Sequence, residues 1–191
     1  MDYIITALIS YLFGSIPFGY IFTKIFLKKD IRDVGSGNIG ATNVLRTGNK
    51  RLGYLTLILD ILKAVIPVIY VKLYYPDLIF ISALCAFLGH LFPVWLKFDG
   101  GKGVATFVGI LISINIYYAL IFGIIWVLTF IISKYSSLSS LIASISIQIY
   151  ILILDNGNFI FFTIMFVLIF YTHRENIKRL INKEETKSKI Y

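Results

Sequence analysis

The feature that most constrains this chain is a series of apolar, uncharged runs, each about as long as a helix that crosses a bilayer. A helix needs about 20 residues to span a hydrocarbon core of about 30 Å, and residues 3–23 form such a run. The further runs are residues 52–71, 78–96, 104–133, 138–154 and 156–172. Their residues do not alternate between polar and apolar as barrel strands do. We therefore expect an all-α integral membrane protein.

The composition supports this class and excludes others. Of the 191 residues, 58% are hydrophobic and only 15% are charged, whereas soluble domains carry about 25% charged residues. We expect residues 1–191 to form a single membrane-embedded domain, with a short basic cytoplasmic tail from about residue 181. The net charge of +8 is compatible with nucleic-acid binding, but most basic residues flank apolar runs. The orientation of the chain in the membrane explains the positions of these basic residues better, so no nucleic-acid partner is expected.

The basic residues also predict which way the chain is inserted. By the positive-inside rule they should share the cytoplasmic side. The clusters consist of Lys28, Lys29, Arg32, Arg46, Lys50 and Arg51, of Lys97 and Lys102, of Lys134, and of Arg174, Lys178, Arg179 and Lys183. Run 104–133 lies between two of these clusters, so it must cross an even number of times. Two short helices turning near Asn115 satisfy this, whereas one long helix would put the tail outside.

We therefore expect seven transmembrane helices, with the N-terminus outside and the C-terminus in the cytoplasm. A polar turn at residues 155–158 would join the last two helices.

A glycine-rich segment in the first cytoplasmic loop is a candidate phosphate site. Residues 35–43 read Gly-Ser-Gly-Asn-Ile-Gly-Ala-Thr-Asn, and Arg46 follows. Glycines let backbone N–H groups turn toward an anion, and an arginine offers two parallel hydrogen bonds to phosphate. The alternative is a flexible linker, but a linker would not be expected to contain so many glycine, asparagine and hydroxyl residues in nine positions. The candidates are Ser36, Gly37, Asn38, Gly40, Thr42, Asn43 and Arg46.

A second glycine-rich segment, residues 98–103, opens directly into an apolar run and includes Gly101, Lys102 and Gly103. The N-terminus of a helix beside a lysine favours anions, although Lys102 could instead extend to the membrane interface. The segment lacks the glycine and hydroxyl residues of a Walker A loop, so nucleotide hydrolysis is unsupported. His90 precedes it and could be a packing histidine; without a second ligand at metal spacing we expect no metal site.

Two charges lie inside the second run. Asp60 and Lys63 are three residues apart on one helical face, and intramembrane charges are usually paired or line a polar cavity. A structural ion pair and a catalytic role both remain open.

Two further polar groups lie near the C-terminal half. Ser137 and Ser140 either cap a helix or line a pocket with hydroxyls. In the tail, His173 and Asn176 share a helical face, and lipid headgroup binding is the alternative role.

Together these segments resemble the bacterial membrane acyl-phosphate:glycerol-3-phosphate acyltransferase family. The likeness rests on residues 10–19, 35–46, 89–106 and 173–180, and it extends over about residues 10–180. It implies a multi-pass enzyme of the bacterial inner membrane, without metal or cofactor, whose active site faces the cytoplasm. The enzyme would move a fatty acyl group from acyl phosphate to the 1-hydroxyl of glycerol 3-phosphate, giving 1-acylglycerol 3-phosphate and inorganic phosphate. Membrane lipid and a functional link to the enzyme that makes acyl phosphate are the other partners implied.

The resemblance also assigns roles. It implies catalytic roles for Ser36, Arg46, Lys102 and His173. Substrate binding would involve Gly37, Asn38, Gly40, Thr42, Asn43, His90, Gly101, Gly103, Ser137, Ser140 and Asn176. The family usually has Ser-Leu-Ala-Ser where this chain has Ser-Leu-Ser-Ser at residues 137–140, and Lys134 stands where arginine is expected. The general base stays open between Ser36, His173 and a phosphate oxygen of the substrate.

The sequence disfavours three other functions. Acyltransferases that use acyl-CoA or acyl carrier protein place an aspartate five residues after a histidine, but here Trp95 and Lys178 occupy those positions. A transporter of phosphate or an organophosphate is disfavoured because no inverted repeat is evident. A structural or regulatory membrane subunit would not need such dense polar motifs.

Overall fold

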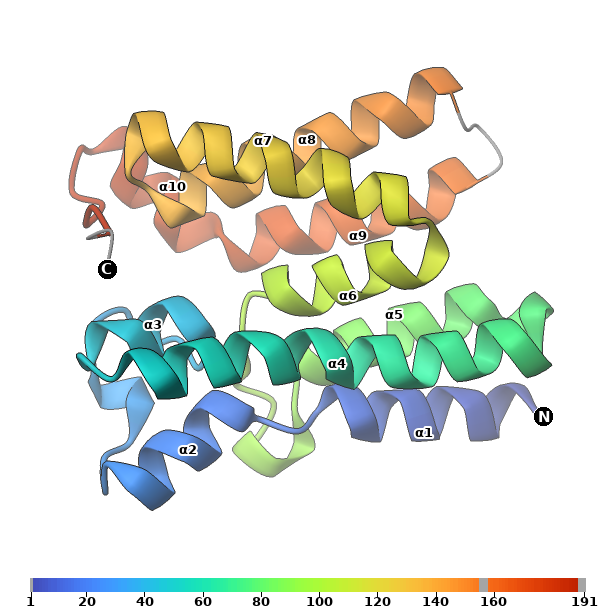
Figure 1. Ribbon diagram of the computed structural model, residues 1–191, viewed down its shortest axis with the longest axis horizontal. Coiled ribbons are helices and arrows are strands. Elements are labelled where there is room, and N and C mark those ends of the chain that lie inside the picture. The colour runs from blue at the N-terminus through green and yellow to red at the C-terminus, as the bar shows by residue number, and fades with distance from the viewer. Residues whose placement is uncertain (1, 155–157, 189–191) are drawn as a thin grey trace. The chain divides into compact units, whose positions relative to one another are not determined.

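The computed structural model describes residues 2–154 and 158–188, and every regular element in those ranges is a helix. The chain divides into two compact units, residues 1–114 and 115–191. Figure 1 labels their helices. The first unit contains α1 (Tyr3–Gly14), α2 (Phe18–Phe26), η1 (Ile31–Asp33), α3 (Ala41–Arg46), α4 (Lys50–Tyr74), η2 (Pro76–Leu78), α5 (Ile79–Leu91), η3 (Val94–Leu96) and α6 (Val104–Ile114). The second contains α7 (Ile116–Ser133), α8 (Ser136–Leu154), α9 (Phe159–Thr172) and α10 (Arg174–Ile181).

Five stretches of the described residues are long and apolar enough to cross a membrane: residues 3–26, 50–74, 76–96, 116–133 and 136–154. The pair α9 and α10, bent by 58°, adds a sixth if it is one span. Helix α6 has 11 residues and is about 16 Å long, roughly half of a hydrocarbon core. The all-helical membrane fold is thus confirmed, while seven crossings and the placement of the termini remain predictions.

A helix break lies at Asn115, where the turn is predicted. Helix α6 ends at Ile114 and α7 begins at Ile116, and the side chain of Asn115 accepts the N–H of Tyr117 at 3.0 Å. An N-terminal cap of this kind starts a new helix. The predicted polar turn at residues 155–158 lies outside the described residues except for Asn158.

The first apolar run differs from the prediction of one continuous helix, because it is interrupted between α1 and α2. Pro17 has no N–H to donate and occupies the break. The hydroxyl of Ser15 donates to the carbonyl of Leu12 at 2.8 Å. The carbonyl of Ile16 accepts the ammonium of Lys63 at 2.8 Å. Side chains thus replace hydrogen bonds that a continuous helix would have made with its own backbone.

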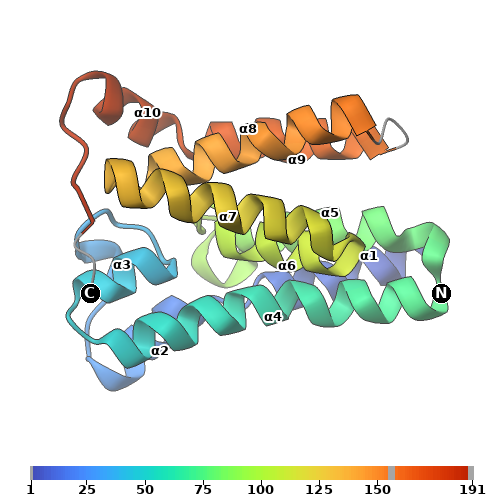
Figure 2. The same cartoon turned by 45° about the horizontal axis from the view of Figure 1, so that its top comes forward.

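Glycines set the close packing of the first unit. Helix α1 packs along α5, and α6 packs along α4 (Figure 2). A Cβ on Gly14 would overlap the backbone of Ala86, and one on Gly89 would overlap the carbonyl of Tyr11. On α6, a Cβ on Gly109 would overlap the carbonyl of Ile61. Small residues allow such close approach of helices in membranes.

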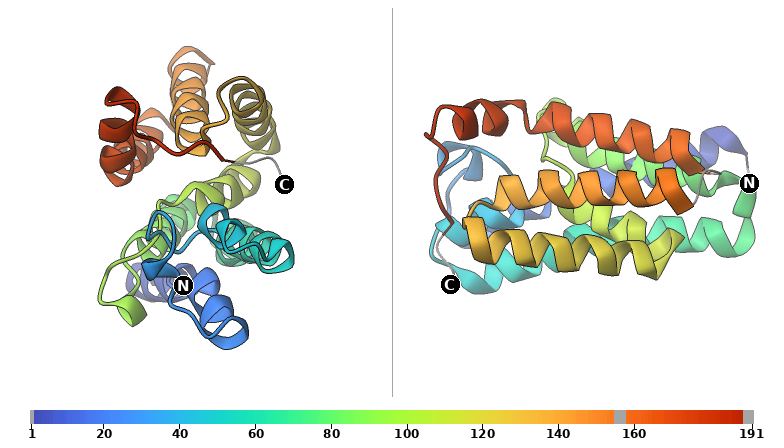
Figure 3. Two further views of the ribbon diagram at one scale, coloured as in Figure 1. Left: turned by 90° about the vertical axis from the view of Figure 1, so that its left-hand side faces the viewer. Right: turned by 90° about the horizontal axis from the view of Figure 1, so that it is seen from above.

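The second unit is built on three long helices. Figure 3 shows α7, α8 and α9 side by side, with α10 at one end and the chain after α10 crossing that end. Tyr118 of α7 makes edge-to-face ring contacts with Tyr150 and Phe162, which lie on α8 and α9. The N–H of Ser188 donates to the carbonyl of Lys134 at 2.8 Å and fixes the returning chain at the turn between α7 and α8.

Candidate active site

The glycine-rich segment 35–43 is held in shape by the side chain of Asn43. Its amide nitrogen donates to the carbonyls of Ile31, Val34 and Asn38 at 3.1, 2.8 and 2.8 Å. Its amide oxygen accepts the N–H of Ser36 at 3.0 Å. Asn43 is buried and directs both ends of its amide into the loop. It therefore acts as the centre of the loop's hydrogen bonding.

Two glycines of this loop adopt backbone angles that other residues rarely adopt. Gly35 has φ of 58° and Gly37 has φ of 71°, both in the left-handed region that favours glycine. A Cβ on Gly35 would also lie 2.5 Å from Oδ1 of Asn43 and 3.1 Å from Cδ of Arg46. The loop thus has no room for a side chain here, and Arg46 of α3 lies beside it.

The predicted binding residues of this loop differ in exposure. Ser36 and Thr42 are exposed, and Arg46 is half-buried. Asn38 uses its side-chain oxygen to accept the N–H of Gly40 at 2.8 Å. The structure therefore separates this motif into residues that shape the loop, Asn38 and Asn43, and residues that an outside ligand can reach.

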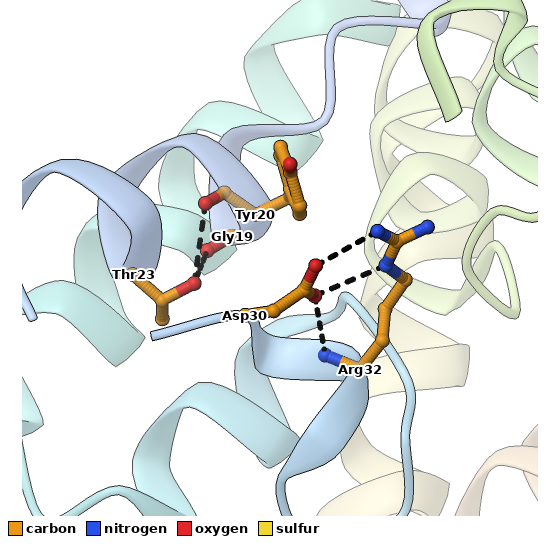
Figure 4. Close-up of polar contacts among 5 residues, drawn as sticks. All are labelled: Gly19, Tyr20, Thr23, Asp30 and Arg32. Atoms are coloured by element: carbon orange, nitrogen blue, oxygen red, sulfur yellow. Dashed lines mark hydrogen bonds and ion pairs between the residues drawn. The ribbon is translucent and has the colours of Figure 1, made fainter. Parts of the chain in front are cut away.

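The segment that leads into the loop is fixed by a two-bond ion pair, shown in Figure 4. Arg32 donates from Nε to Oδ1 of Asp30 at 3.0 Å and from Nη2 to Oδ2 at 2.8 Å. These hydrogen bonds lower the pKa of Asp30 to about 2. The guanidinium of Arg32 also lies 5.2 Å from the ring centroid of Tyr20. Arg32 is therefore engaged in local structure.

The second glycine-rich segment is packed against His90. The N–H of Gly101 donates to the carbonyl of His90 at 3.0 Å, and a Cβ on Gly101 would overlap Nε2 of the imidazole. Gly103 has φ of 84° and faces the ring of Phe87. His90 is buried, whereas Lys102 is half-buried just before α6 begins. Glycine is thus required at both positions that flank Lys102.

An apolar cluster brings the two glycine-rich segments into one neighbourhood within the first unit. It consists of Ile31, Ile39, Val44, Leu52 and Leu96, which are all buried. The first three belong to the first segment or its flanks, and Leu96 ends η3 shortly before the second. Figure 1 shows α2 and α3 near the beginning of α4, which starts just before Leu52. The residues around the first glycine-rich segment thus pack against Leu96, which lies two residues before the second.

In the second unit, His173 lies at the junction of α9 and α10 and is buried. Its Nδ1 is 2.8 Å from the carbonyl of Ile169. A carbonyl oxygen can only accept, so Nδ1 carries the proton, and the lone pair of the neutral ring is on Nε2. The ring is thus held in the tautomer that offers Nε2 as the base or acceptor.

Asn176 and Ser137 meet at a residue that the sequence analysis missed, Glu185. Oε1 of Glu185 accepts from the hydroxyl of Ser137 at 2.8 Å and from Nδ2 of Asn176 at 2.7 Å. Oε2 accepts from Nε of Arg179 at 2.7 Å. Burial opposes ionisation of this carboxyl, but the hydrogen bonds from Arg179, Asn176 and Ser137 outweigh it, so the pKa of Glu185 lies below its usual range.

Asn176 retains one available atom. Its Oδ1 is buried and has no hydrogen-bond partner among the residues that the structure describes. Buried polar atoms nearly always have a partner, so this oxygen is suited to accept a hydrogen bond from a bound molecule. Little in the sequence indicated that Glu185 contacts these residues, because it lies in a polar tail 48 positions after Ser137.

Ser140, the other predicted serine, takes part in helix packing. Its hydroxyl donates to the carbonyl of Ser136 at 2.9 Å and accepts from the indole N–H of Trp126 at 3.0 Å. Within residues 2–154 and 158–188, no group of three or more His, Cys, Asp or Glu side chains is placed to hold a metal ion.

Comparison with known proteins identifies the family. Residues 4–183 match the family described as glycerol-3-phosphate acyltransferase. The chain belongs to the glycerol-3-phosphate acyltransferase family. It is 72% identical over 191 residues to the glycerol-3-phosphate acyltransferase of Pelagibacter ubique, covering 100% of both chains. It is 48% identical over 180 residues to that of Brucella anthropi, covering 93% of this chain and 89% of the relative.

Solved structures agree with these relatives. The crystal structure of PlsY, an integral membrane glycerol 3-phosphate acyltransferase, in its glycerol 3-phosphate form matches with a TM-score of 0.90 and 36% identity. Its lysophosphatidic acid form matches with a TM-score of 0.88 and 35% identity. Each match covers 97% of this chain and 94% of the PlsY chain. The resemblance drawn from the sequence motifs is therefore confirmed at the level of family and fold.

Proposed function

We propose that this acyltransferase moves a fatty acyl group from acyl phosphate to the 1-hydroxyl of glycerol 3-phosphate. The products would be 1-acylglycerol 3-phosphate and inorganic phosphate, and the reaction would serve phospholipid synthesis. The observation that carries this proposal is the loop 35–43, whose backbone is fixed by Asn43 beside Arg46. A backbone loop with an arginine beside it suits a phosphate dianion.

The first unit is proposed to bind acyl phosphate. The backbone of residues 35–43, together with the exposed hydroxyls of Ser36 and Thr42, would hold the phosphoryl group. Arg46 and Lys102 would neutralise its charge. Gly101 and Gly103 would let the backbone beside Lys102 pack closely against His90 and Phe87 and so hold the lysine in place. In this scheme the binding groups are held in place by residues that do not contact the ligand themselves: Asn38, Gly40, Asn43 and His90.

The second unit is proposed to orient glycerol 3-phosphate. Nε2 of His173 and Oδ1 of Asn176 can both accept hydrogen bonds from glycerol hydroxyls. Glu185 would orient Asn176 and Ser137 through its carboxylate. The base that takes the proton of the 1-hydroxyl is then His173, Ser36 or a phosphate oxygen of the substrate.

The chemistry needs no covalent enzyme intermediate. The 1-hydroxyl oxygen attacks the carbonyl carbon of acyl phosphate, the bond between that carbon and the bridging oxygen breaks, and phosphate leaves with the bond electrons. The hydroxyl proton ends on phosphate. Acyl phosphate is a mixed anhydride with a good leaving group, so positioning is the main task. Positioning can supply about 7–11 kcal/mol of a barrier, and each donor to the oxyanion about 2.7–4 kcal/mol.

The membrane arrangement is also proposed. We place the enzyme in the bacterial inner membrane as a single multi-pass domain with seven crossings, the N-terminus outside, and the site and C-terminus in the cytoplasm. The support is the positions of the basic residues and the helix break at Asn115.

Thiol labelling tests this topology in a Cys85→Ser background, which removes the one native thiol. An impermeant thiol reagent added outside should label a cysteine at Asn115, but not one at Asn49 or Lys187. Protection at Asn115 together with outside labelling at Lys187 would contradict the seven crossings.

The decisive assay of function uses purified protein with synthetic acyl phosphate and glycerol 3-phosphate, without metal or nucleotide. We expect 1-acylglycerol 3-phosphate to form, with acyl-CoA unable to replace acyl phosphate. Equal turnover with acyl-CoA would overturn the donor assignment. Exchange of labelled phosphate across sealed vesicles without acylated product would favour the transporter alternative.

A further inference from the structure

Helix α4 contains a buried ion pair that the proposed chemistry does not use. Nζ of Lys63 lies 2.8 Å from Oδ1 of Asp60, and the two side chains are only 2% and 3% exposed. Burying two charges is costly, and apolar replacements of similar volume are often as stable or more so. Stability alone is therefore a poor reason for a charged pair at this place.

The neighbours of the pair indicate another role. Lys63 also donates to the carbonyl of Ile16 at the break between α1 and α2, and its ammonium lies 5.9 Å from the ring centroid of Phe18. On the other side, Oδ1 of Asp60 is 3.9 Å from Nδ1 of His90. The pair therefore connects the broken first span to the imidazole on α5.

His90 transmits this contact to the second glycine-rich segment. Nδ1 of its buried ring has no hydrogen-bond partner among the described residues. Oδ1 of Asp60, which also contacts the ammonium of Lys63, is the carboxylate oxygen that faces it. The opposite edge of the ring touches Gly101, whose N–H donates to the carbonyl of His90. Because a Cβ would not fit between them, the place of the ring fixes the place of the backbone beside Lys102.

We propose that Asp60 and Lys63 are positioning residues that hold the His90 imidazole against Gly101 and thereby place Lys102 for phosphate. This inference rests on the proposed function, in which Lys102 binds the phosphoryl group. The carboxylate orients the imidazole dipole, and Lys63 keeps that carboxylate charged and in place. The buried charges thus serve the geometry of the site.

The first test separates positioning from stability with the double variant Asp60→Leu/Lys63→Met. It removes both charges and fills the same space with apolar side chains of similar volume. Lys72→Met is the matched control, since Lys72 lies on the same helix and donates to the carbonyls of Ser113 and Ile114. We expect the double variant to keep its melting temperature while its KM for acyl phosphate rises about tenfold or more, as misplaced binding groups do. The control should keep the wild-type KM.

The second test observes the ring directly. The chain has two histidines, so isotope-labelled histidine gives two sets of ring signals, and the His173→Ala variant assigns them. In Asp60→Asn, which is nearly isosteric, we expect the His90 signals to shift and those of His173 to stay.

Three outcomes have distinct meanings. Wild-type activity of the double variant, or unchanged His90 signals in Asp60→Asn, would overturn the positioning role. A wild-type protein that does not use acyl phosphate would refute the proposed function, while the ring signals would still report on the contact between Asp60 and His90.

Discussion

Replacing Asn43 by alanine tests the idea that one amide shapes the phosphate loop. The change removes the two N–H groups of Asn43, which are shared among the carbonyls of Ile31, Val34 and Asn38, and the oxygen that accepts the N–H of Ser36. At about 0.5–1.5 kcal/mol for each of these two donors and one acceptor, the loss is about 1.5–4.5 kcal/mol. That is a large share of the stability of a typical domain.

The assay measures the melting temperature and kcat/KM of the purified protein in the same detergent. We expect Asn43→Ala to have a lower melting temperature. Its kcat/KM should fall by about 10²-fold or more, because a small misplacement of binding groups has effects of this size. Asn43→Asp should behave similarly, since a carboxylate keeps the acceptor but cannot donate to the three carbonyls.

Asn38→Ala is the matched control, because it removes one hydrogen bond of the same loop, to the N–H of Gly40. It should cost about 0.5–1.5 kcal/mol and much less activity. If Asn43→Ala kept wild-type melting and activity, the loop would not depend on this amide. Equal effects of the two alanine variants would refute the reasoning from bond number.

Three further predictions concern single side chains. Arg46→Lys keeps the charge but loses the planar fork, so kcat/KM should fall strongly at unchanged melting temperature; full activity would limit Arg46 to a topology signal. His173→Ala should chiefly raise KM for glycerol 3-phosphate with a smaller fall in kcat, whereas loss of a general base would lower kcat by about 10²–10⁴-fold. Glu185→Gln should be less stable than wild type at neutral pH. Because the folded-state pKa of Glu185 lies below the unfolded-state value of 4.5, this difference should shrink as pH falls below 4.5; a difference independent of pH would contradict the charged role.

The sequence predicted the all-helical membrane fold because apolar runs of this length have few alternatives in a bilayer. Helix α6, with 11 residues, is shorter than a usual span, so the seven crossings stay a prediction. The sequence also located the helix break at Asn115, since the basic residues on both sides required an even number of crossings. The break at residues 15–17 was missed because the run is uncharged throughout, and the partner of the freed carbonyl, Lys63, comes from another helix.

The candidate site was likewise predicted only in part. The glycines, Arg46 and Lys102 could be proposed as phosphate-binding residues from their types and spacing. The support of the loop by Asn43 and of Asn176 by Glu185 could not, because a hydrogen bond between distant residues leaves no local pattern. A neutral amide in a motif reads equally well as a ligand or as a support, and only its partners decide.

The uncharged support of the loop 35–43 has a consequence for how the enzyme responds to ionic strength. The bonds of Asn43 join neutral groups, so salt does not screen them and they do not titrate between acid and neutral pH. Attraction between Arg46 or Lys102 and a phosphate is screened, with a Debye length of about 8 Å at physiological ionic strength. Added salt should therefore weaken substrate capture while the shape of the empty loop stays the same.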